Sequence, residues 1–183
     1  MKTGCIKMKL NKVLYIAVGA PNSGKTTKLK NRIDGFGGAY ISRDDIRFAL
    51  VKPEEGYFTH EGQVFETFIK LIQEALDNPH GPRDVYADAT HLNKASRKKL
   101  IKHLNLDCVD KIIIMSFHCP KETLIERNLL RNGRERLPLS ALERMIDSMD
   151  TPSVNEHPLF EIWDIDGYGY IAPEEPKGIS PDE

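Results

Sequence analysis

The strongest constraint on the fold of this 183-residue chain is the spacing Gly19-x4-Gly24-Lys25-Thr26. It follows the almost wholly apolar run at residues 13–18, VLYIAV, which has the length and composition of a strand buried on both faces. Glycines at this spacing let the backbone fold around a phosphate with its N–H groups pointing inward, and the N-terminus of a following helix adds positive potential. The pattern therefore predicts a phosphate-binding loop between a strand and a helix.

The side chains of this loop predict ATP and Mg²⁺ as cofactors. Lys25 is expected to reach the β and γ phosphates, and the hydroxyl of Thr26 is expected to bind Mg²⁺. The ion and the lysine would together neutralise the charge that develops on a transferred phosphoryl group, so Lys25 is expected to be catalytic. The residues of the loop that we expect to contact the nucleotide are Gly19, Asn22, Ser23, Gly24, Lys25, Thr26 and Thr27.

Short apolar runs alternate with helical patterns along the rest of the chain. Further strands are expected at residues 39–42, 84–88, 111–117 and, at an edge, 161–166, and helices at 25–32, 59–78, 94–104, 120–132 and 140–149. Asn93 is expected to cap one helix, and Ser140 with Glu143 to form a capping box on another. The alternation predicts an α/β fold of the P-loop NTPase class, with a parallel sheet flanked by helices and an adenylate-kinase-like helical lid.

Length and composition predict one domain over residues 1–171 and a flexible, acidic, proline-rich tail over 172–183. The formal net charge of −1 supplies no global attraction to nucleic acid. No run approaches the ~18 apolar residues of a membrane span, and the three cysteines lack metal-ligand spacing, which is typical of reduced thiols. We therefore expect a cytoplasmic protein that binds no membrane, and the sequence is compatible with a homo-oligomer.

A second polar element, SRDDIR, follows the strand expected at residues 39–42. A kinase needs a group near the γ-phosphate that positions or deprotonates the accepting hydroxyl, and Asp44 is the candidate. Arg47 lies about one helical turn further on and is placed to bind a phosphate on the acceptor. The alternative is that Asp44 or Asp45 caps the next helix, and both interpretations can hold for different carboxylates.

Asp88 and a group of arginines complete the expected site. Asp88 closes an apolar strand, as a Walker B carboxylate does, and is placed to hold Mg²⁺ through water or to orient the acceptor; its alternative role is to cap the next turn. Arg127 and Arg131 are four residues apart, so we expect them on one helix face that closes over ATP. Gly133 is the expected hinge of a lid over about residues 127–138, and an exposed charged helix is the alternative.

Two further groups of residues have less specific interpretations. A basic cluster is interpreted first as a solvated face and second as a rim for nucleic acid; it consists of Arg97, Lys98, Lys99 and Lys102. Tyr57, Phe58 and His60 precede the long helix, and either stacking on a base or burial is compatible with their position.

Four segments resemble the 5′-hydroxyl polynucleotide kinases, typified by the kinase domain of bacteriophage polynucleotide kinase-phosphatase. They are residues 19–27 (GAPNSGKTT), 41–47 (ISRDDIR), 88–93 (DATHLN) and 126–138 (ERNLLRNGRERLP), and the resemblance covers about residues 13–149. It implies that Asp44 is the general base on the 5′-hydroxyl, that Arg47 contacts the acceptor's 3′-phosphate, and that Arg131 stabilises the transferring phosphoryl group. The sequence NGRER leaves the choice between Arg131 and Arg134 open, and we expect no phosphatase domain after the lid.

The expected function is therefore transfer of the ATP γ-phosphoryl group to the 5′-hydroxyl end of DNA or RNA, with Asp44, Arg47 and Asp88 binding the substrate. Two alternatives change only the acceptor, to a hydroxymethyl group on a pyrimidine base in DNA or to a nucleoside or sugar hydroxyl. A nucleotide-dependent switch is an alternative of a different class, because it would use the same loop without an acceptor base.

Overall fold

The computed structural model describes residues 10–52 and 54–166, so the expected tail at 172–183 lies outside the described residues. Within these ranges, five parallel strands form one sheet in the order β2-β3-β1-β4-β5. The strands are β1 (Lys12–Val18), β2 (Ala39–Ser42), β3 (Asp84–Asp88), β4 (Val109–His118) and β5 (Phe160–Asp166). The predicted parallel sheet is confirmed, with β5 at an edge as expected.

Helices cover both faces of the sheet because its central strands are apolar on both faces. All seven residues of β1 are buried. Leu14, Ile16 and Val18 pack in one core cluster with Phe68 and Leu100, whereas alternate residues of the same strand pack in a second cluster on the opposite face. The helices are α1 (Lys25–Phe36), α2 (Arg43–Leu50), α3 (Glu61–Asp77), α4 (Lys94–Lys102), α5 (Lys121–Leu129) and α6 (Leu139–Asp147), with short 3-10 turns η1 (Gly133–Glu135) and η2 (Val154–Glu156).

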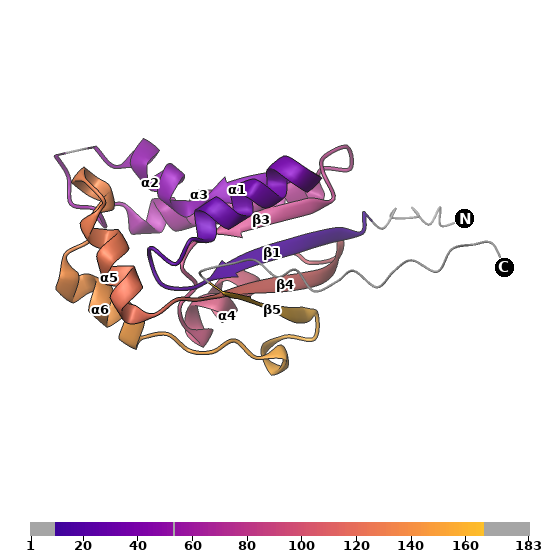
Figure 1. Ribbon diagram of the computed structural model, residues 1–183. Coiled ribbons are helices and arrows are strands. Elements are labelled where there is room, and N and C mark those ends of the chain that lie inside the picture. Colours follow the sequence, from indigo (N-terminus) through magenta and orange to yellow (C-terminus); the bar gives the residue numbers. More distant parts are fainter. Residues whose placement is uncertain (1–9, 53, 167–183) are drawn as a thin grey trace, which may run out of the picture.

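Three helices lie around the carboxyl end of the sheet, which is where ligands bind in parallel α/β folds. Figure 1 shows α2, α5 and α6 gathered beyond the carboxyl ends of the strands, while the loops at the opposite end of the sheet lie away from them. The strands predicted at 39–42 and 84–88 have the predicted bounds. The helix predicted at 25–32 continues to Phe36, because Gly35 stays inside it and the chain turns only at Gly37, where φ is 75°.

Two further predictions at helix termini are wrong. Helix α5 ends at Leu129 rather than near residue 132, because the side chain of Asn128 binds both main-chain groups of Leu137 and folds the chain back. The predicted capping box of Ser140 and Glu143 does not form, since α6 already begins after Pro138 and has no side-chain cap. Arg131 therefore lies beyond a helix and not on one.

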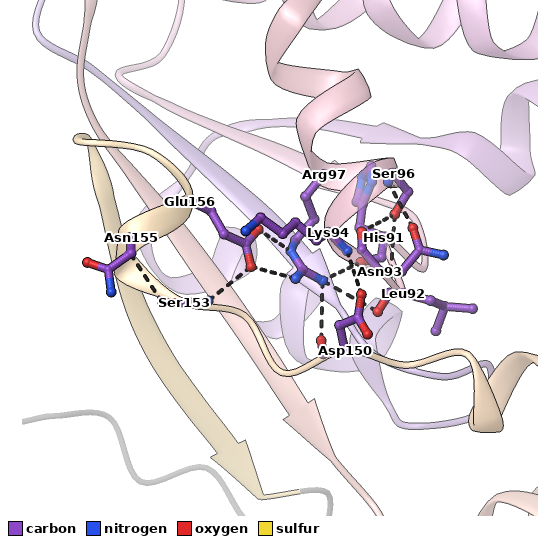
Figure 2. Close-up of polar contacts among 10 residues, drawn as sticks. All are labelled: His91, Leu92, Asn93, Lys94, Ser96, Arg97, Asp150, Ser153, Asn155 and Glu156. Atoms are coloured by element: carbon purple, nitrogen blue, oxygen red, sulfur yellow. Dashed lines mark hydrogen bonds and ion pairs between the residues drawn. The ribbon is translucent and has the colours of Figure 1, made fainter.

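The interpretation of Arg97 as part of a solvated face is also wrong, although the three lysines of that cluster are exposed. The Arg97 side chain is fully buried. Its guanidinium donates to both carboxylate oxygens of Glu156, at 2.8 and 2.6 Å, and to the carbonyl oxygens of His91, Leu92 and Asp150 (Figure 2).

Arg97 thereby fastens the loop that follows β3 to the segment that follows α6. Asp150 reinforces this contact, because its N–H donates to Leu92 and its carboxylate accepts from the N–H of Lys94 (Figure 2). The same loop carries Thr90, whose carbonyl oxygen accepts a 3.0 Å hydrogen bond from the N–H of Gly19. The buried arginine therefore supports the loop on which the phosphate-loop backbone rests.

We predict that Arg97→Ala lowers the free energy of unfolding by about 3–5 kcal/mol, because it removes the cation that pairs with the 7%-exposed Glu156 carboxylate and the donor to the carbonyl oxygens of His91 and Asp150. Urea unfolding at neutral pH measures the change. Lys98→Ala is the matched control on the same helix and should stay within about 0.5 kcal/mol of the unsubstituted protein. Equal midpoints for the two variants would contradict the structural role of Arg97.

The same pair predicts a pH dependence. Hydrogen bonds from Arg97 lower the pKa of Glu156. A carboxyl group whose pKa is lowered on folding adds stability above its ordinary pKa of about 4.3, and that stability is lost as the pH falls through the lower, folded-state pKa. The difference in stability between the unsubstituted protein and Arg97→Ala should therefore narrow on acidification below about pH 4. A difference that stays constant from pH 7 to pH 3 would argue against the pair.

Candidate functional site

The carboxyl ends of β1, β2 and β3 open onto a polar cleft of about 450 Å³. Most residues predicted to form a site line this cleft: Asn22, Gly24, Lys25, Thr26, Thr27, Asp44, Arg47, Asp88 and Arg131. The fold thus brings together side chains from four separate predicted segments. Gly19 and Ser23 lie at the base of the phosphate loop, and Arg127 lies on its flank.

The phosphate loop depends on glycine at two positions. Gly24 precedes α1 in the left-handed region, with φ 89° and ψ 8°, and no side chain caps the helix there. The first N–H groups of α1 are therefore left for an anion rather than for a capping oxygen. At Gly19 a Cβ atom would lie 3.0 Å from the Cβ of Phe117 and 2.9 Å from Ser23 Oγ, so only glycine fits.

Lys25 is buried within the loop, and its Nζ donates to the carbonyl oxygen of Ala20 at 2.7 Å. Burial lowers the pKa of Lys25 to about 8, while the charges of Asp88 and Asp44 act in the opposite direction. The ammonium group thus remains mainly protonated at neutral pH, and the charges of the two carboxylates favour this form.

Asp88 is buried at the end of β3, and its Oδ2 accepts hydrogen bonds from Thr26 Oγ1 at 2.7 Å and from the Tyr40 hydroxyl at 2.6 Å. The alternative that Asp88 caps the turn into the next helix is wrong, because its carboxylate binds Thr26 and Tyr40 while Asn93 caps α4 through a capping box with Ser96. The cap at Asn93 is as predicted. The sequence analysis missed Tyr40, although its alternation with Ile41 in β2 would have placed the ring on one face.

The hydroxyl and the carboxylate fit a magnesium ion, which prefers oxygen ligands and keeps several waters and phosphate oxygens among them. Residues 10–52 and 54–166 contain no cluster of three His, Cys, Asp or Glu side chains that could hold a metal without such help. Thr26 and Asp88 would therefore hold Mg²⁺ together with the phosphates of a nucleotide.

Asp44 stands in the cleft at the first turn of α2, with 63% of its side chain exposed. Its Oδ1 pairs with Arg47 Nη1 and accepts a 2.9 Å hydrogen bond from the hydroxyl of Tyr57. The alternative that a carboxylate caps α2 is wrong, because Ser42 Oγ is the cap and accepts from the N–H of Asp45. Both carboxylates are therefore available for other roles.

Arg47 is buried, and its guanidinium contacts protein groups. Nε donates to Glu61 Oε1 at 2.8 Å, and Nη1 donates to the Tyr57 hydroxyl at 3.0 Å as well as to Asp44. Burial and the charge of Asp44 raise the pKa of Tyr57 to about 12, so this hydroxyl stays protonated and can donate to Asp44. The sequence analysis missed Glu61 and the hydroxyl role of Tyr57, because no pattern links them to α2.

The arginines of the expected lid take different positions. Arg131 lines the cleft, and its charge lowers the pKa of Lys25. Arg127 Nη1 donates to the carbonyl oxygen of Asn22 at 3.1 Å, so it lies beside the phosphate loop. Arg134 turns away from the loop: Nη2 donates to the carbonyl oxygen of Val51 at 3.0 Å, and the guanidinium lies 5.1 Å from the ring centre of Phe48.

Residues 14–152 match the family model described as AAA domain. The chain is 26% identical over 130 residues to probable UMP-CMP kinase 2 of Arabidopsis thaliana, which covers 65% of this chain and 48% of that protein. It is 29% identical over 132 residues to UMP-CMP kinase 3 of the same plant, covering 67% and 63% respectively. The chain thus spans about half to two thirds of the length of these curated relatives.

Solved structures show the same fold. A sugar kinase from Janibacter sp. HTCC2649 has a TM-score of 0.60 at 16% identity, with 87% of each chain covered. A fungal RNA kinase has a TM-score of 0.55 at 15% identity, covering 90% of this chain and 77% of its own. A chain of the Pnkp1/Rnl/Hen1 RNA repair complex has a TM-score of 0.61 at 24% identity, covering 75% and 43%. The fold is therefore that of P-loop kinases, a five-stranded parallel sheet flanked by helices.

Among residues 10–52 and 54–166, none of the helices combines the length and the apolar character that crossing a bilayer requires.

We predict that Gly24→Ala weakens binding of ATP by about tenfold or more. A left-handed backbone costs an alanine about 1–2 kcal/mol, and relief of that strain would turn the N–H groups of the loop away from the phosphates. Isothermal titration with ATP and Mg²⁺ measures the change. Gly35→Ala is the matched control, because nothing lies within 4 Å of the added Cβ, and its affinity should be unchanged. If both variants bound ATP equally well, this loop would not be the nucleotide site.

Proposed function

The chain belongs to the AAA domain family, and from this premise we propose that it is an ATP-dependent kinase that phosphorylates the 5′-hydroxyl end of DNA or RNA. One observation carries the proposal: Asp44 and Lys25 line the same cleft, and the charge of the carboxylate acts on the pKa of the lysine. An acceptor hydroxyl placed between them would have a base on one side and a phosphate-binding loop on the other.

In the proposed reaction, the phosphate loop holds the nucleotide and Asp44 takes the proton of the acceptor hydroxyl. The acceptor oxygen forms a bond to the γ-phosphorus, the bond from that phosphorus to the β–γ bridging oxygen breaks, and ADP leaves. Lys25 and Arg131 neutralise negative charge on the transferring group. Bound Mg²⁺ supplies further charge neutralisation at the β and γ phosphates, and Thr26 and Asp88 are its proposed protein partners.

For Arg47 we propose a role in positioning Asp44, whereas the resemblance to polynucleotide kinases implies contact with the acceptor's 3′-phosphate. Because its guanidinium contacts Asp44, Glu61 and Tyr57, contact with a 3′-phosphate of the acceptor would compete with bonds inside the protein. In this proposal the main role of Arg47 is to hold the carboxylate of Asp44, the proposed general base, in the cleft. Substitution of Arg47 would then lower kcat and also weaken binding of the acceptor.

The proposed domain is the whole of residues 1–171, with residues 127–138 as its lid. Within that lid the positions of the arginines favour Arg131 as the residue that faces the transferring group, because Arg134 is engaged at Val51. A nucleic-acid acceptor is supported by two of the similar structures, whose descriptions name an RNA kinase and an RNA repair complex.

A nucleoside monophosphate kinase is the second candidate, because the matching relatives are described as UMP-CMP kinases. The charge in the cleft argues against it. The acceptor of such an enzyme is a phosphate that is already ionised, so it needs no base and would be repelled by an exposed carboxylate at Asp44. A hydroxyl acceptor is uncharged and needs a general base, so an exposed carboxylate at Asp44 suits it.

Incubation with γ-labelled ATP and Mg²⁺ distinguishes the acceptors. The compared acceptors are 5′-hydroxyl DNA and RNA oligonucleotides, DNA with a hydroxymethyl pyrimidine, UMP, CMP and a sugar acid. We expect label at the 5′ end of an oligonucleotide. Internal label would indicate the modified base, and label on UMP or CMP would indicate the second candidate. Label on the sugar acid would indicate a small-molecule kinase, and slow hydrolysis without any acceptor would indicate a switch.

We predict that Asp44→Asn lowers kcat for the oligonucleotide by at least about 100-fold, because the amide keeps the shape of the side chain and the hydrogen bond from Tyr57 but cannot take a proton. The dissociation constant of ATP should change less than about threefold, since the carboxylate is expected to contact only the acceptor. Asp45→Asn makes the same change one residue away and serves as the control. Loss of kcat in Asp45→Asn alone would show that the general base is Asp45 and not Asp44.

A further inference from the structure

An exposed aromatic ring lies in the wall of the otherwise polar cleft. The side chain of Phe58 lines the cleft and is 61% exposed. Burying a phenylalanine ring is worth about 1.5–3 kcal/mol, so an open ring beside a reacting group is a favourable surface for a ligand with an apolar face. Phe58 is therefore not buried, so that alternative from the sequence is wrong for this residue. Its exposed ring is compatible with the other alternative, stacking on a base.

The ring of Phe58 is held by its neighbours. It meets the ring of Tyr57 edge to face, with centroids 4.8 Å apart and an angle of 82° between the planes. The guanidinium of Arg47 lies 5.9 Å from the Phe58 centroid and 4.5 Å from that of Tyr57. A ring fixed in this way loses little conformational entropy when a ligand stacks on it.

The position of the ring relative to the proposed base is also fixed. Tyr57 is the adjacent residue, and its hydroxyl lies 2.9 Å from Asp44 Oδ1. The other aromatic ring of this wall, Phe48, is only partly exposed and lies beneath the guanidinium of Arg134. The exposed ring of Phe58 therefore belongs to the residue next to Tyr57, which binds Asp44. A ligand whose hydroxyl binds Asp44 lies near this ring.

We propose that Phe58 is the platform on which the terminal nucleobase of the acceptor stacks, an inference that rests on the proposed kinase function. A nucleobase is planar and has a π-face, which a phosphate or an acyclic sugar acid lacks. Stacking of a base on an aromatic side chain is worth about 1–3 kcal/mol and tolerates any base, so the subsite accepts a nucleic-acid end without reading its sequence. The acceptor class is thus a nucleotide end with its base present.

The first test compares the steady-state kinetics of the full chain with Phe58→Ala on a 5′-hydroxyl oligonucleotide. The KM of the oligonucleotide should rise by about fivefold or more, which corresponds to the loss of one stacked base, while the KM of ATP stays the same. Phe58→Trp should restore the KM, because it keeps a stacking face. Phe36→Ala is the matched control: this ring is 72% exposed at the far end of the 12-residue helix α1, about 18 Å along its axis from the phosphate loop, and its removal should change neither KM.

The second test uses an oligonucleotide whose 5′-terminal residue lacks its base but keeps the 5′-hydroxyl. The unsubstituted protein should bind it about fivefold or more weakly than the normal oligonucleotide, and Phe58→Ala should bind both alike. Fluorescence anisotropy with ADP present measures this affinity independently of turnover. Equal affinity of the unsubstituted protein for the two oligonucleotides overturns the stacking platform even if phosphoryl transfer is active. Failure of transfer to every oligonucleotide overturns the proposed function instead, and the binding comparison still decides the role of Phe58.

Discussion

The hydrogen bond from Thr26 to Asp88 joins the phosphate loop to the end of β3, and the rest of the site depends on it. The bond forms because the parallel register pairs Ser42 with Asp88 and Ile16 with Ala87, which brings three strand ends level. A slip of one residue would turn the Asp88 side chain to the opposite face of the sheet, since side chains alternate along a strand. Sheet register is therefore what assembles the site from distant segments.

Two charge networks divide the cleft. On the donor side, the buried ammonium of Lys25 lies near carboxylates whose attraction offsets part of the cost of its burial. On the acceptor side, Glu61 pairs with both Arg43 and Arg47, and Arg47 pairs in turn with Asp44. The second network explains how an exposed carboxylate can keep one orientation, because a buried arginine and a phenol hold the same oxygen. The sequence predicted Lys25, Asp44, Arg47 and Asp88 as site residues, but neither of the two networks.

Predictions from the sequence succeeded where the relevant information is local. The phosphate loop, the bounds of β2 and β3 and the cap at Asn93 each depend on neighbours within a few residues. They failed where the partner is remote in the chain. The carboxylate that buries Arg97 lies 59 residues further on, so a basic cluster and a buried anchor look alike in sequence. The early end of α5 depends on a nearer contact, because Asn128 binds Leu137 nine residues further on, but no local pattern announces this pair either.

The acceptor wall and the lid are physically connected, and this connection shapes how substrates would be selected. Val51, at the end of α2, accepts a hydrogen bond from Arg134 of η1, while Arg131 three residues earlier faces the cleft. A movement of the turn that brings Arg131 toward a nucleotide therefore also acts on the segment that leads from α2 to Phe58. The phosphate loop is common to kinases with many acceptors, so acceptor choice has to come from this segment. In the proposed mechanism, closure of residues 127–138 over ATP would therefore also act on the acceptor subsite, because Arg134 binds Val51 and lies three residues after Arg131.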